Sequence, residues 1–337
     1  MKTVVLNDAG LSLHVEVQGE GPLIVCVHGW PELSYSWRHQ LAYFSTRGYR
    51  IAAMDVRGYG NSSVPWAVNA YSMRNLCRDV AAVVTALLDA PSGAPSDGPT
   101  KPYTQHKAIL FGHDWGAPIV WNTAVLFPEL IEAVAGLSVP FVPIRSRSFL
   151  EIAAEVYRDR FFYQLYFQED GRAEADFEAD VGVALRKVYY ALSGEGLRDP
   201  TVYKAMRHKG KSDALLTDLV DPVPFPHWLT PEDLTFYQTT FSRTGFRGAF
   251  NRYRAQTLDV TELADIAGLP VTQPACFIAG ALDPVRTFVP GVDAYAKAGA
   301  HCLDFRGATI LPDIGHWVQQ EAPAATNEAL AAFLAGL

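Results

Sequence analysis

The sequence KAILFGHDWGAPIV, residues 107–120, combines an apolar run, a glycine-flanked turn and the start of a helical pattern. The apolar run Ala108–Phe111 is typical of a buried strand in a parallel sheet. The turn Gly112–Gly116 follows it, and residues Ala117–Phe127 then show apolar positions at helical spacing. Strand, sharp turn and helix are the context of a nucleophile elbow, where glycines permit a strained turn that raises one side chain into a pocket.

The elbow residue is Asp114, at a position where serine is the usual nucleophile. A serine that attacks a saturated carbon would leave an ether, which water does not cleave, whereas a carboxylate leaves an ester that an activated water can hydrolyse. The elbow therefore suggests a substrate with an electrophilic alkyl carbon, such as an epoxide or an alkyl halide. Gly-x-Asp-x-Gly also occurs in ordinary loops, where Asp114 would only cap the next helix, so the motif needs support from the rest of the chain.

Composition limits the possible classes of protein. The chain has 337 residues, of which 49% are hydrophobic and 19% charged, enough for one large domain with an insertion or for two modest ones. A net charge of -8 and the lack of a basic run argue against nucleic acid as a partner. We find no signal peptide and no window of ~18 unbroken apolar residues, so we expect no membrane association.

Cofactor and metal motifs are not found. No Gly-x-Gly-x-x-Gly follows a predicted strand, and no Cys/His pair has the spacing of zinc ligands, so we expect neither a cofactor nor a metal. The four cysteines are far apart in apolar stretches, which favours buried free thiols in a reducing compartment and hence a cytoplasmic protein. They are Cys26, Cys77, Cys276 and Cys302.

Strand and helix patterns alternate along most of the chain. A hairpin is predicted from Thr3–Val5 and Leu11–Val17 with a turn at 7–10. Further strands are predicted at 23–27, 49–54, 131–139, 275–279 and 302–305, and helices at 35–44, 73–88, 290–298 and 324–334. The segment 91–102, rich in Pro, Gly and Ser, is predicted to be a surface loop.

The alternation is interrupted between residues 141 and 255, where helical periodicity is rich in aromatic residues and lacks clear strands. This pattern predicts an α/β fold with a parallel sheet and a helical insertion, which would lie over the carboxyl ends of the strands. We assign residues 1–140 and 256–337 to the core and 141–255 to a helical cap.

Three candidate catalytic residues each follow an apolar strand. In chain order they are Asp114, Asp283 and His316, which is the nucleophile, acid and histidine order of the α/β-hydrolase fold. His316 would be the base, and Asp283 would orient its ring and stabilise its charged form. Taken singly, Asp283 could be a turn residue before Pro284 and His316 a loop histidine, but all three together favour a catalytic triad.

Several motifs link the chain to a known family. They are His28-Gly29-Trp30-Pro31, Tyr35–Gln40, Asp55–Ser62, Gly112–Gly116, Tyr163–Gln168 and Phe246–Tyr253. With these motifs the chain resembles the epoxide hydrolases of the α/β-hydrolase fold over nearly its whole length. The last two motifs are the most specific, because other α/β hydrolases lack these lid segments.

The resemblance implies a mostly parallel, predominantly eight-stranded sheet with a helical lid, and no amino-terminal phosphatase domain. It also implies that Tyr163 and Tyr253 activate the epoxide oxygen, which two phenols with pKa near 10 can do without losing their protons. His28, Gly29 and Pro31 would then shape a loop beside the nucleophile.

The resulting hypothesis is an epoxide hydrolase, a hydrolase that acts on ether bonds. Asp114 would form an alkyl ester, His316 would activate a water to hydrolyse it, and the backbone N–H groups of Trp30 and Trp115 would hold the oxyanion. The partners would be a small epoxide and water, with the protein a monomer or homodimer. A haloalkane or haloacid dehalogenase with the same triad is the nearest alternative, and a non-catalytic binding protein of the same fold is another.

Overall fold

The computed structural model describes residues 2–5, 10–89 and 106–337. Within these residues one sheet contains eight strands in the order β1-β2-β4-β3-β5-β6-β7-β8. Their bounds are Lys2–Val5 (β1), Ser12–Gln18 (β2), Leu23–Val27 (β3), Arg50–Met54 (β4), Ala108–His113 (β5), Ile131–Leu137 (β6), Val271–Gly280 (β7) and Cys302–Leu311 (β8). The β1–β2 and β2–β4 pairs are antiparallel and the remaining pairs are parallel, which confirms the predicted α/β fold with a mostly parallel sheet.

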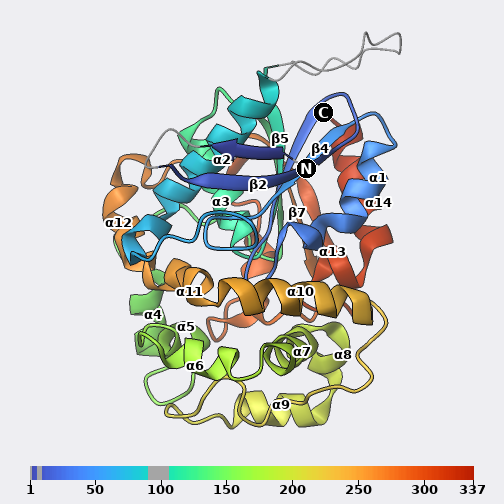
Figure 1. Ribbon diagram of the computed structural model, residues 1–337. Coiled ribbons are helices and arrows are strands. Elements are labelled where there is room, and N and C mark those ends of the chain that lie inside the picture. The colour runs from blue at the N-terminus through green and yellow to red at the C-terminus, as the bar shows by residue number, and fades with distance from the viewer. Residues whose placement is uncertain (1, 6–9, 90–105) are drawn as a thin grey trace.

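Helices cover both faces of the sheet (Figure 1). They are α1 (Arg38–Ser45), α2 (Met73–Leu88), α3 (Gly116–Leu126), α13 (Val318–Glu321) and α14 (Pro323–Ala335). The central strand β3 is apolar and buried at every position, as expected of a strand with both faces covered. In β3, Val25 packs in the same cluster as α2 and α3, whereas its neighbour Ile24 packs in the cluster with α1 and α14.

A helical segment separates β6 from β7 and lies beyond one end of the sheet (Figure 1). Its helices are α4 (Phe149–Val156), α5 (Tyr163–Tyr166), α6 (Arg172–Glu178), α7 (Val181–Leu192), α8 (Gly194–Arg198), α9 (Pro200–Arg207), α10 (Pro231–Thr244), α11 (Arg247–Arg254) and α12 (Gln256–Glu262). β6 and β7 run parallel, so their carboxyl ends meet at one edge of the sheet. The elbow residue Asp114 lies at this edge, facing the helical segment. The division of the chain at residues 141 and 255 stays a prediction.

Some predicted boundaries are wrong, each for a local reason. In place of the predicted helix at 290–298 the structure has one short 3-10 turn, Ala294–Lys297, because Gly291 adopts a positive φ of 77° that interrupts helical geometry. The strand predicted at 302–305 continues to Leu311, since an edge strand does not need an apolar pattern. The predicted helix at 35–44 divides into a 3-10 turn, Ser34–Trp37, and α1.

Two further predictions concern turns and loops. The strand predicted to reach Val139 ends at Leu137, because Ser138 has a φ of 65° and leaves the extended conformation. The turn predicted at 7–10 falls largely outside the described residues, and the loop predicted at 91–102 falls entirely outside them. None of the helices in the described part of the chain has both the length and the hydropathy needed to cross a bilayer.

Candidate active site

The turn between β5 and α3 holds Asp114 in a strained conformation. Its φ is 50°, in the left-handed region that residues other than glycine rarely adopt. Both flanking glycines are needed for this turn: a Cβ on Gly112 would overlap the carbonyl oxygen of Gly116, and one on Gly116 would overlap that of Val27. A Cβ on Gly29 would overlap the Asp114 side chain itself. The chain therefore brings the His28–Pro31 loop directly against the elbow.

Substitution of Gly116 tests how tightly the elbow is packed. In a helix, glycine to alanine normally stabilises by about 1 kcal/mol, but here the added methyl group would overlap the backbone of β3. We therefore expect Gly116→Ala to lower the free energy of unfolding by about 1–3 kcal/mol, measured by urea denaturation. Gly336→Ala is the control, because the nearest atom to its new methyl group is 3.5 Å away. Equal stability of the two variants would contradict this interpretation.

The Asp114 carboxylate is buried and held at both oxygens. Oδ1 accepts the Trp30 N–H at 2.7 Å, and Oδ2 lies 3.2 Å from Nε2 of His316. Burial would raise the pKa of this carboxyl, but its contacts with His316, the nearby charge of His113 and the Trp30 N–H outweigh burial and lower it below its usual value. Asp114 is therefore ionised at neutral pH, as a nucleophile must be.

The predicted acid, Asp283, contacts the other nitrogen of His316. Nδ1 of His316 lies 2.9 Å from Oδ2 of Asp283, whose Oδ1 accepts the Val285 N–H at 2.9 Å. Burial alone would lower the pKa of the imidazole, but Asp283 and Asp114 raise it well above its usual value. The structure thus brings the three predicted triad residues, 202 residues apart at the extremes, into one hydrogen-bonded chain.

Tyr163 of α5 and Tyr253 of α11 line the same cavity as Asp114. The ring centroids of the two tyrosines are 5.7 Å apart. The ring centroid of Trp30 is 6.4 Å from that of Tyr163 and 5.9 Å from that of Tyr253. Burial and the negative charge of Asp114 raise the pKa of Tyr163, and burial raises that of Tyr253 as well. Both phenols are therefore protonated at neutral pH and can donate hydrogen bonds.

A cavity of about 290 Å³ joins these groups. Asp114, His316, Tyr163 and Tyr253 all line it. Most of its other lining residues are apolar or aromatic: Trp30, Tyr157, Phe161, Phe162, Val188, Ala191, Leu192, Met206, Leu215, Leu219, Pro284, Val285 and Phe288. Such a site suits an apolar ligand whose reactive group meets a few polar side chains at one end.

The two predicted oxyanion donors differ in what they contact. Trp30 N–H donates to Asp114, as described, but among the hydrogen bonds of the described residues none joins Trp115 N–H to that carboxylate. The Trp115 ring contacts Arg252, whose guanidinium carbon is 4.6 Å from the ring centroid, and Tyr253, whose ring centroid is 5.4 Å away.

The predicted loop residues hold the backbone beside Asp114. Nε2 of His28 accepts the Val56 N–H at 3.0 Å, so its proton is on Nδ1, which donates to the Gly29 carbonyl at 2.8 Å. Burial lowers the pKa of His28, which is consistent with this neutral form. Pro31 offers its carbonyl oxygen to the Tyr189 hydroxyl at 2.7 Å, which joins the loop to α7.

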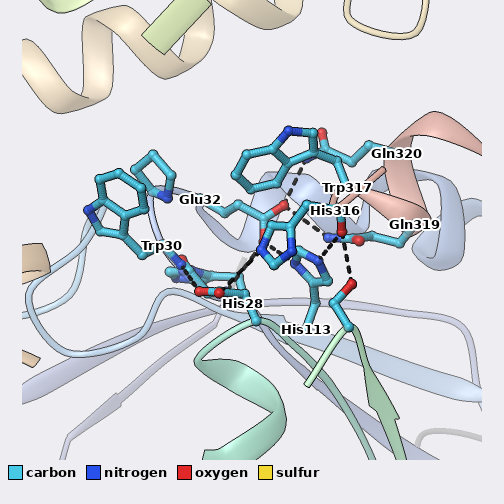
Figure 2. Close-up of polar contacts among 12 residues, drawn as sticks. His28, Trp30, Glu32, His113, His316, Trp317, Gln319 and Gln320 are labelled. Atoms are coloured by element: carbon cyan, nitrogen blue, oxygen red, sulfur yellow. Dashed lines mark hydrogen bonds and ion pairs between the residues drawn. The ribbon is translucent and has the colours of Figure 1, made fainter. Parts of the chain in front are cut away.

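Sequence reasoning missed a buried polar network behind His316 (Figure 2). Glu32 is fully buried, and its Oε2 lies 2.6 Å from Nδ1 of His113, while Oε1 accepts the side-chain amides of Gln319 and Gln320. Nε2 of His113 donates to the carbonyl oxygen of His316 at 2.7 Å. The network thus fixes the backbone that carries the candidate base. The signal available in the sequence was an acidic residue directly after the His28–Pro31 loop.

Comparison with known proteins gives consistent results. A family model described as alpha/beta hydrolase fold matches residues 22–92. The chain is 37% identical to Epoxide hydrolase A of Mycobacterium tuberculosis, over 97% of this chain and 95% of the relative, and 35% identical to Epoxide hydrolase B of the same species, over 99% and 98%.

Solved structures of epoxide hydrolases are also similar to this chain. An epoxide hydrolase from an endophytic Streptomyces matches with a TM-score of 0.88 and 39% identity, covering 99% of this chain and 95% of that one. Epoxide Hydrolase A from Mycobacterium thermoresistibile matches with a TM-score of 0.85 and 37% identity, covering 100% and 98%.

Proposed function

Because this chain belongs to the epoxide hydrolase family of the α/β-hydrolase fold and opens epoxides to vicinal diols, we propose that Asp114 is its nucleophile and His316 its base. The observation that carries this proposal is the hydrogen-bonded chain from Asp114 through His316 to Asp283 at the end of an apolar cavity. The position of Asp114 on a strained elbow, with one oxygen facing the imidazole, supports the same roles.

In the first half-reaction, Oδ2 of Asp114 attacks a ring carbon of the epoxide from behind. Oδ1 accepts the Trp30 N–H, so with Oδ2 as the attacking atom Oδ1 becomes the ester carbonyl oxygen beside its proposed oxyanion donor. The C–O bond of the ring breaks, and its oxygen accepts hydrogen bonds from Tyr163 and Tyr253. The alkoxide takes a proton from one of these phenols, which regains a proton from solvent, and the product remains attached to Asp114 as an ester.

In the second half-reaction, His316 activates the water that hydrolyses the ester. The charge of Asp114 helps to raise the pKa of His316 in the resting protein. Ester formation removes this charge, so the pKa of His316 falls and the neutral base becomes available when it is needed. Asp283 stabilises the imidazolium that forms, and the Trp30 and Trp115 N–H groups serve as donors to the oxyanion.

Labelled oxygen tests the ester. In a single turnover with excess enzyme in heavy-oxygen water, the oxygen added to the diol comes from Asp114, so the diol is unlabelled. The label enters the Asp114 carboxylate and appears in the diol only in later turnovers. Labelled diol from the first turnover would mean direct attack by water and would overturn the proposal.

Removal of either phenol tests the role of the tyrosines. We expect Tyr163→Phe and Tyr253→Phe each to lower kcat/KM by about tenfold to a hundredfold, because one donor to the departing oxygen is lost in each, and the double variant to lose more. Stopped-flow kinetics with an aryl epoxide measures this. Tyr203→Phe is the control, since Tyr203 is an exposed residue of α9. Unchanged rates in the double variant would exclude the proposed role.

The dehalogenase alternative is not favoured. The relatives and solved structures reported above are epoxide hydrolases, and the two phenols that line the cavity with Asp114 suit a departing oxygen. A halide-release assay run beside the epoxide assay separates the two activities.

We also propose that the protein works in the cytoplasm, as a monomer or homodimer. The free thiols of Cys26, Cys77, Cys276 and Cys302 support a reducing compartment. Cell fractionation tests the location, and light scattering after size-exclusion chromatography measures the oligomeric state.

A further inference from the structure

The loop that carries His316 is held by the turn between α7 and α8. The His316 N–H donates to the Leu192 carbonyl at 2.8 Å, and Nε1 of Trp317 donates to the Tyr189 carbonyl at 2.8 Å. The candidate base is therefore attached through its own backbone to the helical segment that lies over the site.

Glycines allow this contact to be backbone against backbone. A Cβ on Gly194 would overlap the carbonyl oxygen of Asp313, and a Cβ on Gly315 would overlap the carbonyl of Leu192 and the nitrogen of Gly194. On the other side, a Cβ on Gly280 at the end of β7 would overlap the carbonyl of Gly315. The His316 loop is thus enclosed between β7 and the α7–α8 turn, with no room for a side chain at these positions.

The carboxylate of Glu321 connects the α7–α8 turn with the loop that carries His316. Glu321, the last residue of α13, accepts the Gly194 N–H at 2.7 Å and the Gly315 N–H at 3.2 Å on Oε2, and the Trp317 N–H at 3.0 Å on Oε1. Gly315 and Trp317 flank His316 on either side, and Gly194 begins α8. Burial raises the pKa of the Glu321 carboxyl to about 7, although the three N–H donors act to lower it. In the ionised form, which predominates above that pH, its hydrogen bonds are roughly twice as strong as neutral ones, so this side chain holds the backbone on both sides of the base.

We propose that Glu321 is a positioning residue for the second half-reaction: it joins α8 to the two N–H groups beside His316 and so sets the direction of the imidazole against the ester. The proposal rests on the mechanism given above, in which His316 acts only after the ester has formed. Glu321 does not line the cavity, so its effect on turnover must act through His316 and not through contact with the substrate.

Glutamine cannot reproduce this arrangement. Its amide presents one oxygen and one NH₂, whereas all three partners of Glu321 are N–H donors. In Glu321→Gln the NH₂ would face either Trp317 N–H or the Gly194 and Gly315 pair, so one of these contacts is lost and the loop must shift. The size and shape of the side chain are otherwise unchanged.

Rapid-mixing kinetics separates the two half-reactions. Wild type, Glu321→Gln and the control Glu328→Gln, an exposed glutamate on α14, are mixed in excess with an aryl epoxide. Ester formation and decay are followed by acid quench and intact-protein mass spectrometry. For Glu321→Gln we expect ester formation within about twofold of wild type, and ester hydrolysis slowed by about tenfold or more, because a small misplacement of a catalytic group has an effect of this order. The ester then accumulates, so kcat and KM fall together.

Equal slowing of both steps in Glu321→Gln, or no slowing of either, would overturn the proposal in favour of a purely structural role. If Glu321→Gln is recovered only unfolded, Glu321→Asp is measured instead, since it keeps the charge but is one methylene too short to reach all three N–H groups, and the same step-specific loss is expected. If the wild-type protein forms no ester at all, the proposed mechanism itself is refuted. If the wild-type protein forms and hydrolyses the ester and Glu321→Gln does so at the same rates, only the role of Glu321 is refuted.

Discussion

Asp114→Asn is expected to form diol at a rate at least about four orders of magnitude below wild type, the scale seen when a nucleophile of a catalytic triad is removed. The variant should fold normally, because the asparagine oxygen can still accept the Trp30 N–H at the position of Oδ1. Its amide nitrogen cannot attack the epoxide carbon, so no ester forms. Diol formation and intact-protein mass after incubation with epoxide are the two measurements.

A matched control separates this loss from a general effect of substitution at a strained residue. Asp218 also has a positive φ, 60°, and lies exposed in the helical segment away from the triad. Asp218→Asn is therefore expected to keep wild-type turnover. Substantial turnover by Asp114→Asn, or an adduct on that protein, would show that another group is the nucleophile.

His316→Gln is expected to complete the first half-reaction and then stop. The Trp30 N–H still donates to Asp114, and Tyr163 and Tyr253 remain in place, so we expect the epoxide to be opened and the ester to accumulate to one equivalent per protein. Steady-state turnover falls by about four orders of magnitude. Mass spectrometry of the denatured protein should show a gain equal to the mass of the epoxide, and peptide mapping should place it at Asp114.

Two companion variants make this result decisive. The double variant Asp114→Asn/His316→Gln should gain no mass, and His208→Gln, which changes an exposed histidine of the helical segment, should turn over as wild type does. If His316→Gln gains no mass while it still binds epoxide, the imidazole would be needed for the first step, and the division of roles between Asp114 and His316 would be wrong.

The sequence was sufficient to predict that Asp114, Asp283 and His316 meet, because Asp114 and Asp283 each follow a strand with a clear apolar pattern and His316 follows the next strand along the chain. Parallel strands place their carboxyl ends at one edge of the sheet, so Asp114, Asp283 and His316 were expected to meet. The two tyrosines are a different case. Residues 141–255 contain many aromatic residues, and only resemblance to a family distinguished Tyr163 and Tyr253 from side chains that merely pack.

The polar network behind His316 could not be predicted from local pattern. Glu32 and His113 are 81 residues apart. Glu32 directly follows Pro31 and His113 directly precedes Asp114, and in each case the sequence predicts a role for the neighbour and not for the residue itself. Nothing in the periodicity of the sequence indicates that two such groups meet in the buried interior. The length of β8 was underestimated for a related reason, because an exposed edge strand carries little apolar signal.

The helical segment of this enzyme cannot be exchanged independently of the loop that carries His316. Consider a chimera in which residues 141–255 come from a relative and the rest of the chain is kept. The relative's α7–α8 turn would then pack against Gly315, where one extra methyl group has no space. Grafts intended to alter substrate range should therefore transfer residues 313–321 from the same donor. Libraries built in this way would vary the lining of the cavity while preserving the alignment of the base.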